Sequence, residues 1–174
     1  MRKFIAGVIL GVGGLAAVGF VYMHYGFVNL TADQPVSRME RAVMGGGMDR
    51  YAERYASKVT DPVEPNDINL IEGIRLYRAN CAMCHGDFGK PVSELGRGFY
   101  PRTPQFLSDA PDMPPEQNFW IIKHGVRWTG MPAWGKLMPD SDIWKITTFL
   151  GKMDELDKFS PAVQDAWKNP GTKP

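Results

Sequence analysis

Residues 81–85 read Cys81-Ala82-Met83-Cys84-His85 and contain the only two cysteines among the 174 residues of the chain. Two cysteines at this spacing place their thiols about one helical turn apart, and the histidine follows immediately. The C-x-x-C-H pattern is typical of attachment of a c-type haem. Each thiol can form a thioether with one porphyrin vinyl group, and the histidine then lies against the iron. The motif therefore predicts one haem c, covalently attached through Cys81 and Cys84, with His85 as an axial ligand.

Other uses of a cysteine pair fit this sequence less well. A redox pair of the thioredoxin type belongs to a βαβ context, and no segment here shows the sustained alternation of a strand. A structural zinc ion needs four ligands. The chain offers two cysteines and three histidines, of which His24 follows the apolar N-terminal segment. A disulfide across two intervening residues would close almost no loop. Haem attachment remains the best interpretation of the motif.

The second axial ligand of such an iron has to come from a distant part of the chain. Methionine is the usual partner of histidine in electron-transfer haems, because His/Met ligation raises the reduction potential. Met131 stands out among the ten methionines, since Gly130 allows close backbone approach and Pro132 stiffens the chain after it. We expect His85 and Met131 to be the two iron ligands. The alternative ligands are Met113 and Met138, each of which precedes a proline, and the histidine His124.

The sequence around the motif resembles that of class I c-type cytochromes. Gly73 and Tyr77 precede the cysteine motif at the spacing seen in that family, and a proline-rich loop follows it. Residues 129–134, Thr-Gly-Met-Pro-Ala-Trp, and a C-terminal helix with aromatic residues complete the likeness. The resemblance covers about residues 68–153. It implies an all-α fold, in which helices and long loops wrap around one haem.

Two features of the domain are implied by this resemblance alone. The first and last helices should cross next to the haem, with Gly73 and Tyr77 facing Trp144 or Phe149. A loop proline carbonyl should accept the second N–H of the ligating imidazole, which needs an acceptor in any case. This proline is Pro101 or Pro104, and we include Pro101 among the predicted haem-contacting residues. The two haem propionates need donors, and the candidates are Arg127, Trp134, Tyr100 and Arg102.

Apolar spacing predicts four helices in the region after residue 66. They cover about 67–82, 115–124 and 140–152, and a short last helix starts at Ser160-Pro161. In the first of them the apolar positions at helical spacing are Ile68, Ile71, Ile74 and Tyr77. The loop over 86–111 is rich in glycine and proline and carries no periodic pattern.

The N-terminal segment reads as a membrane anchor. Arg2 and Lys3 precede an uncharged run from Phe4 to Leu30, whose most apolar part ends at Met23. Twenty residues of helix span about 30 Å, the thickness of the hydrocarbon core of a bilayer. The alternative is a cleaved signal peptide, but its apolar region would be shorter, about 7–15 residues. Positive charges before the span predict a cytoplasmic N-terminus and an exported remainder.

These patterns divide the chain into four parts. We expect a cytoplasmic tip and anchor at 1–30, a stalk at 31–66, the haem domain at 67–155, and a C-terminal helix and tail at 156–174. Within the stalk, breaks at prolines and at the glycines of positions 45–47 separate two short helical candidates, 36–44 and 48–58. Such short helices are marginal by themselves, so they either pack on the haem domain or dock on a partner.

The predicted function is the transfer of single electrons. Iron bound by both His85 and Met131 has no open position for a substrate, and no enzyme motif is found elsewhere in the chain. The partners would be a membrane-bound redox complex, a soluble electron carrier, or both, with the haem domain on the periplasmic side of the inner membrane. The net charge of +1 gives no indication of nucleic-acid binding. The rivals are a haem enzyme or gas sensor with an open sixth position, and a thiol or scaffold protein without haem.

Overall fold

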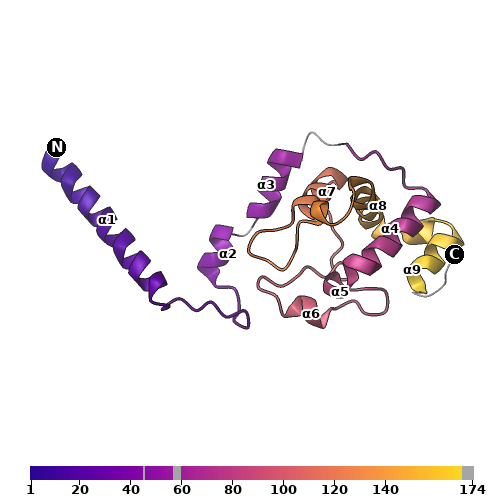
Figure 1. Ribbon diagram of the computed structural model, residues 1–174, viewed down its shortest axis with the longest axis horizontal. Coiled ribbons are helices and arrows are strands. Elements are labelled where there is room, and N and C mark those ends of the chain that lie inside the picture. The colour runs from indigo at the N-terminus through magenta and orange to yellow at the C-terminus, as the bar shows by residue number, and fades with distance from the viewer. Residues whose placement is uncertain (45, 57–59, 170–174) are drawn as a thin grey trace. The chain divides into compact units, whose positions relative to one another are not determined.

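The computed structural model describes residues 1–44, 46–56 and 60–169 (Figure 1). Apart from one isolated bridge between Asp87 and Lys90, the regular elements of these residues are all helical, as the predicted fold class requires. The chain divides into two compact units, Met1–Gln34 and Pro35–Pro174. The helices are α1 (Arg2–His24), α2 (Arg38–Met44), α3 (Gly47–Ala56), α4 (Asp67–Asn80), α5 (Ala82–His85), α6 (Glu94–Arg97), α7 (Pro115–His124), η1 (Trp134–Lys136), α8 (Asp140–Leu150), η2 (Met153–Lys158) and α9 (Pro161–Lys168).

The first unit consists mainly of the 23-residue helix α1. Its apolar 18-residue stretch has a mean hydropathy of 2.4, and none of its residues is buried within the chain. At 1.5 Å per residue it is about 35 Å long, enough to cross a bilayer. It is the one helix among the described residues that is long and apolar enough for this, and it fits a single-pass anchor.

The second unit is organised around the crossing of α4 and α8. Gly73 makes this crossing possible, because a Cβ atom there would lie only 2.3 Å from the carbonyl oxygen of Lys145 and 2.9 Å from the Cβ of Phe149. Tyr77 lies one turn further along α4, and its ring centroid is 5.3 Å from that of Phe149. The small residue and the aromatic residue predicted to face one another are therefore Gly73 and Phe149. Trp144 instead stacks on Phe119 of α7, with centroids 3.9 Å apart.

The apolar face predicted for α4 needs one correction. Ile68 is 79% exposed, whereas Leu70 and Ile74 are buried against α8. The helix is capped by Asn66, whose side chain accepts a hydrogen bond from the backbone N–H of Asn69. Ile68 therefore belongs to the first turn, on the side away from the core.

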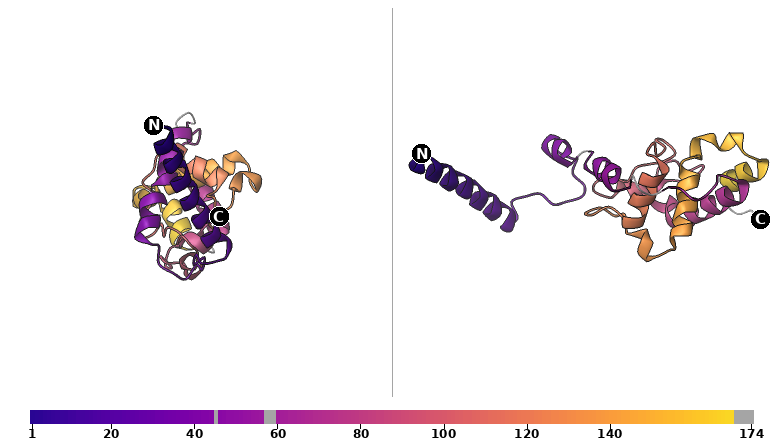
Figure 2. Two further views of the ribbon diagram at one scale, coloured as in Figure 1. Left: turned by 90° about the vertical axis from the view of Figure 1, so that its left-hand side faces the viewer. Right: turned by 90° about the horizontal axis from the view of Figure 1, so that it is seen from above.

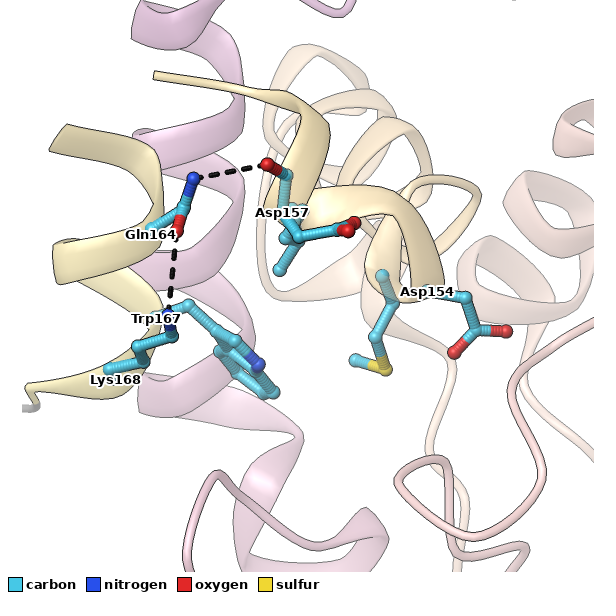
Figure 3. Close-up of a pocket in the computed structure, with 7 residues that line it drawn as sticks. Asp154, Asp157, Gln164, Trp167 and Lys168 are labelled. Atoms are coloured by element: carbon cyan, nitrogen blue, oxygen red, sulfur yellow. Dashed lines mark hydrogen bonds between the residues drawn. The ribbon is translucent and has the colours of Figure 1, made fainter. Parts of the chain in front are cut away.

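The C-terminal helix α9 lies alongside α4 and is held there by Arg78 (Figures 1 and 2). The guanidinium of Arg78 donates to the backbone carbonyls of Ala166 and Trp167, and its Nε lies 2.9 Å from a carboxylate oxygen of Asp87. Between η2 and α9 is a hollow of about 230 Å³ (Figure 3). Gln164 closes one side of this hollow by donating to the carbonyl of Asp157.

The segment expected to be a stalk is attached to the rest of the second unit at several points. Ala52 and Ala56 of α3 are completely buried, and Tyr55 stacks on Trp120 of α7 at 6.3 Å between centroids. We call α2 and α3 together the arm. Glu40 in α2 accepts a hydrogen bond from Tyr100 Oη, and Asp61, beyond the arm, accepts one from Thr148. Of the two alternatives predicted for these helices, the structure shows α3 packed within its own chain, against α7. Residues 45 and 57–59 of the predicted stalk lie outside the described residues.

Candidate functional site

Both cysteines lie where α4 ends and α5 begins. The backbone N–H of Cys81 still donates to Tyr77, while the N–H groups of Cys84 and His85 both donate to the carbonyl of Cys81. This single tight turn brings the three side chains of the motif together. Burial raises the pKa of the Cys81 thiol to about 12, and the neighbouring Cys84 adds to the effect. Reactive dithiols have lowered thiol pKa values instead, so the site does not resemble a redox-active cysteine pair.

The imidazole of His85 is held in one orientation from two sides. Its Nδ1 lies 2.9 Å from the carbonyl oxygen of Pro104. The ring of Phe106 stacks on it, with centroids 4.1 Å apart and an angle of 17° between the planes. Burial lowers the pKa of His85 and so favours the neutral ring. With Nδ1–H donating to the carbonyl, Nε2 carries the free lone pair, as a metal ligand requires.

The acceptor of this hydrogen bond is Pro104 and not Pro101, which was the residue included among the predicted haem contacts. Gln105 explains why. Its side-chain amide donates to the carbonyls of Cys84 and Thr103, at 3.0 and 2.9 Å, and accepts from the backbone N–H of Ser93 at 2.6 Å. Residues 103–106 are thereby fixed against the motif, and Pro101 lies before this fixed stretch.

Several residues that hold the motif in place were not predicted. Gln105 and Phe106 follow a proline in an irregular loop, where periodicity carries no signal. Gly96 is buried against the motif. A larger residue would not fit there, because a Cβ atom would lie 2.1 Å from the carbonyl oxygen of Cys84. The buried hydroxyl of Tyr77 donates to the carbonyl of Gly86 at 2.7 Å, immediately after the motif. Only Tyr77 had a sequence signal, through its spacing to the cysteines.

Met131 lies in a loop closed by backbone contacts. Its N–H donates to Thr129 Oγ1 at 3.1 Å, and its carbonyl accepts from the N–H of Val126 at 3.2 Å. Gly130 is required because the ring of Phe99 lies within 2.6 Å of the position of a Cβ atom there. The Met131 side chain is partly buried and packs against the core. A thioether sulfur is thus presented from a well-defined loop.

The remaining candidates have the following surroundings. Trp134 begins η1 and packs partly buried against the core. Arg127 is exposed, with its guanidinium carbon 6.0 Å from the centroid of the Trp128 ring. His124 lies against the ring of Trp120, at 4.0 Å between centroids, which is a packing role that needs no iron. Of the two alternative methionines, Met138 is partly buried and its side chain packs against the core. The backbone carbonyl of Met113 accepts a hydrogen bond from the side-chain amide of Asn118.

The donor set fits a haem better than a bare metal ion. No group of three or more His, Cys, Asp or Glu side chains within the described residues could hold a metal ion by itself. One imidazole nitrogen and one thioether sulfur suit an iron whose other four ligands belong to a porphyrin. Two thiols on one turn beside the imidazole suit its covalent attachment.

Comparison with known proteins gives one match. Residues 69–150 match the family described as cytochrome C oxidase, cbb3-type, subunit III. The matched region begins in α4, ends with α8, and contains both the cysteine motif and Met131. No curated protein and no solved structure matches the chain.

Proposed function

We propose that the chain carries single electrons as a membrane-anchored monohaem cytochrome c, because residues 69–150 match a c-type cytochrome family and the N-terminal helix fits a membrane anchor. The observation that carries the proposal is the hydrogen bond between His85 Nδ1 and Pro104. It leaves Nε2 of a neutral imidazole free beside two thiols, which is the arrangement that a covalently attached haem needs.

Each functional residue has a defined task in this proposal. Cys81 and Cys84 would attach the haem, and His85 Nε2 and the Met131 sulfur would be the two protein ligands of its iron. When bound, the haem supplies an Fe(II)/Fe(III) couple for transfer of one electron. The protein holds the imidazole by its hydrogen bond to Pro104 and the Met131 loop by its hydrogen bonds to Thr129 and Val126. The predicted contacts of Trp134, Arg127 and Pro101 with the haem remain predictions, and Pro101 is no longer the expected acceptor for His85.

The tether limits where the partner can lie. Because α3 packs on α7 and Glu40 of α2 accepts a hydrogen bond from Tyr100, only residues 25–37 form the tether between the anchor helix and the arm. Thirteen residues reach at most about 45 Å when fully extended, whereas a free chain over 25–66 would reach about 140 Å. We therefore infer a partner in the same membrane, a membrane-bound redox complex of a respiratory chain. A soluble carrier on the periplasmic side of the inner membrane is the second exchange partner in this proposal.

Covalent haem attachment is the first property to test. The full chain is produced together with a cytochrome c maturation system, separated by denaturing electrophoresis and stained for haem. The wild type and the variant His124→Ala should both stain. The double variant Cys81→Ser/Cys84→Ser should lose the stain although the polypeptide is present. An unstained wild type would instead favour a thiol or scaffold protein, and the proposal would fail.

A further inference from the structure

Trp128 has an unusual backbone conformation and an unusual exposure. It is the one non-glycine residue with positive φ among those that the structure describes, at 60°. A bulky side chain rarely adopts this region, and doing so costs stability. Its side chain is also 80% exposed, more than any other large apolar side chain described after Leu30. The tryptophan therefore lowers the stability of the fold while its indole lies in solvent, and a glycine would suit this backbone better.

The turn that presents Trp128 is firmly closed. The N–H and the hydroxyl of Thr129 both donate to the carbonyl of Val126, at 3.3 and 2.8 Å. The same Thr129 oxygen accepts from the N–H of Met131, and Val126 donates back to the Met131 carbonyl. Trp128 is therefore fixed at the tip of the loop that carries the proposed iron ligand, three residues before it.

A positive charge accompanies the indole. Arg127 is exposed and lies over the Trp128 ring. Within the described part of the chain, Arg127 makes no ion pair with a carboxylate. Tryptophan and arginine are the residue types most enriched among those that dominate binding energy at protein interfaces. An indole offers a large apolar surface with one N–H donor, and the guanidinium offers a charge for an acidic group.

We propose that Trp128 and Arg127 form the docking anchor for the membrane-bound redox partner, a role that replaces the haem-propionate contact predicted for Arg127 from the sequence. The partner presents an apolar recess for the indole, bordered by carboxylates that meet Arg127. Docking at this tip brings the partner's cofactor close to Met131, so the contact that gives affinity also shortens the path to the iron. This inference rests on the proposed electron-transfer function and names the surface by which that function is exercised.

The test uses membranes from native cells in which the variant replaces the wild-type copy. Respiring membranes are mixed rapidly with oxygen, and the rate of haem oxidation is measured by its absorption. The small oxidant ferricyanide, whose potential is high enough to oxidise a His/Met haem, provides a second rate that needs no docking. Trp128→Gly removes the indole and relieves the backbone, so folding is preserved. Ile68→Ala is the matched control, because Ile68 is 79% exposed at the start of α4.

We expect Trp128→Gly to slow oxidation by the membrane partner at least tenfold, with an unchanged rate for ferricyanide and an unchanged or higher unfolding temperature. Ile68→Ala should leave both rates unchanged. Added salt should slow the wild-type reaction, and Arg127→Gln should weaken that dependence.

Three results would overturn the inference. Trp128→Gly could react with the membrane partner at the wild-type rate. Both oxidants could be slowed equally, which would place Trp128 against the haem. Arg127→Gln could shift the reduction potential and leave the salt dependence intact, which would assign Arg127 to a propionate. If the wild-type haem is not oxidised by the membranes at all, the proposed function itself fails.

Discussion

The carbonyl oxygen of Pro104 lies 2.9 Å from Nδ1 of His85 and fixes which imidazole nitrogen is free. Pro104 reaches this place because its neighbour Gln105 hydrogen-bonds to Cys84, in the cysteine motif, and to Ser93, where the short helix α6 begins. The orientation of the ligand therefore depends on a glutamine that contacts neither the imidazole nor the iron.

Replacing Gln105 by leucine should destabilise the domain. The change leaves two carbonyls and one N–H without their partners in a partly buried place, which should lower the free energy of unfolding by about 2–3 kcal/mol. Denaturant titration of the haem-bound protein measures this. The exposed Gln34, exchanged for leucine in the same way, should have no effect. Equal stability of the Gln105→Leu variant and the wild type would show that this side chain does not hold Pro104 in place.

Gly73→Ala should disrupt the crossing of α4 and α8. The new methyl group would lie 2.3 Å from a backbone oxygen that cannot move without shifting α8. We expect a loss of about 3 kcal/mol or more, at the upper end of the costs of overpacking. Gly151→Ala is the matched control, since the nearest atom to its Cβ position is 3.6 Å away. Thermal unfolding of both variants measures the effect. Gly151→Ala should leave the unfolding temperature unchanged or raise it slightly. Similar unfolding temperatures for the two variants would contradict the packing described at Gly73.

Ala52→Glu should release the arm from the haem domain. Ala52, in α3, is completely buried, and a carboxylate cannot remain there without a partner. Trypsin should then cleave after Arg54 at least tenfold faster than in the wild type, as followed by mass spectrometry. Ala42→Glu makes the same exchange at an exposed position of α2 and should leave cleavage unchanged. If Ala52→Glu is cleaved at the wild-type rate, α3 is not held by its contact with α7, and the short tether is wrong.

Regular elements were predictable from the sequence because their signals are local. The helix predicted over 115–124 is α7 with those bounds, and Ser160-Pro161 caps and begins α9 as expected. By contrast, α6 and the two 3-10 helices are too short to show periodicity. Ser93 caps α6, but no periodic apolar pattern follows it in the sequence, so it could not be recognised as a helix start.

The surroundings of the site were only partly predictable, for a related reason. The motif residues and Met131 are recognisable from type and spacing alone. The choice between Pro101 and Pro104 depends on hydrogen bonds from Gln105 to residues far away in the sequence, which no local pattern reveals. The amphipathic pattern of α3 indicated that its apolar face needs a partner, but it could not show that α7 is that partner.

Met131→Ala tests the second iron ligand. Loss of the thioether should abolish the sulfur-to-iron absorption band near the red edge of the oxidised spectrum and lower the reduction potential, by on the order of 100 mV or more, while the haem stays attached. Met113→Ala and Met138→Ala serve as controls, and both should keep the band. A band that persists in Met131→Ala and disappears in one of these controls would move the ligand to that methionine.

Exposure of the reduced, full-length protein to carbon monoxide tests the central claim most directly, because it asks whether the iron has a free position. With His85 and Met131 both bound, the reduced spectrum should not change, and the oxidised protein should show the red-edge band. Rapid binding of carbon monoxide would contradict the account and would indicate a haem enzyme or gas sensor instead.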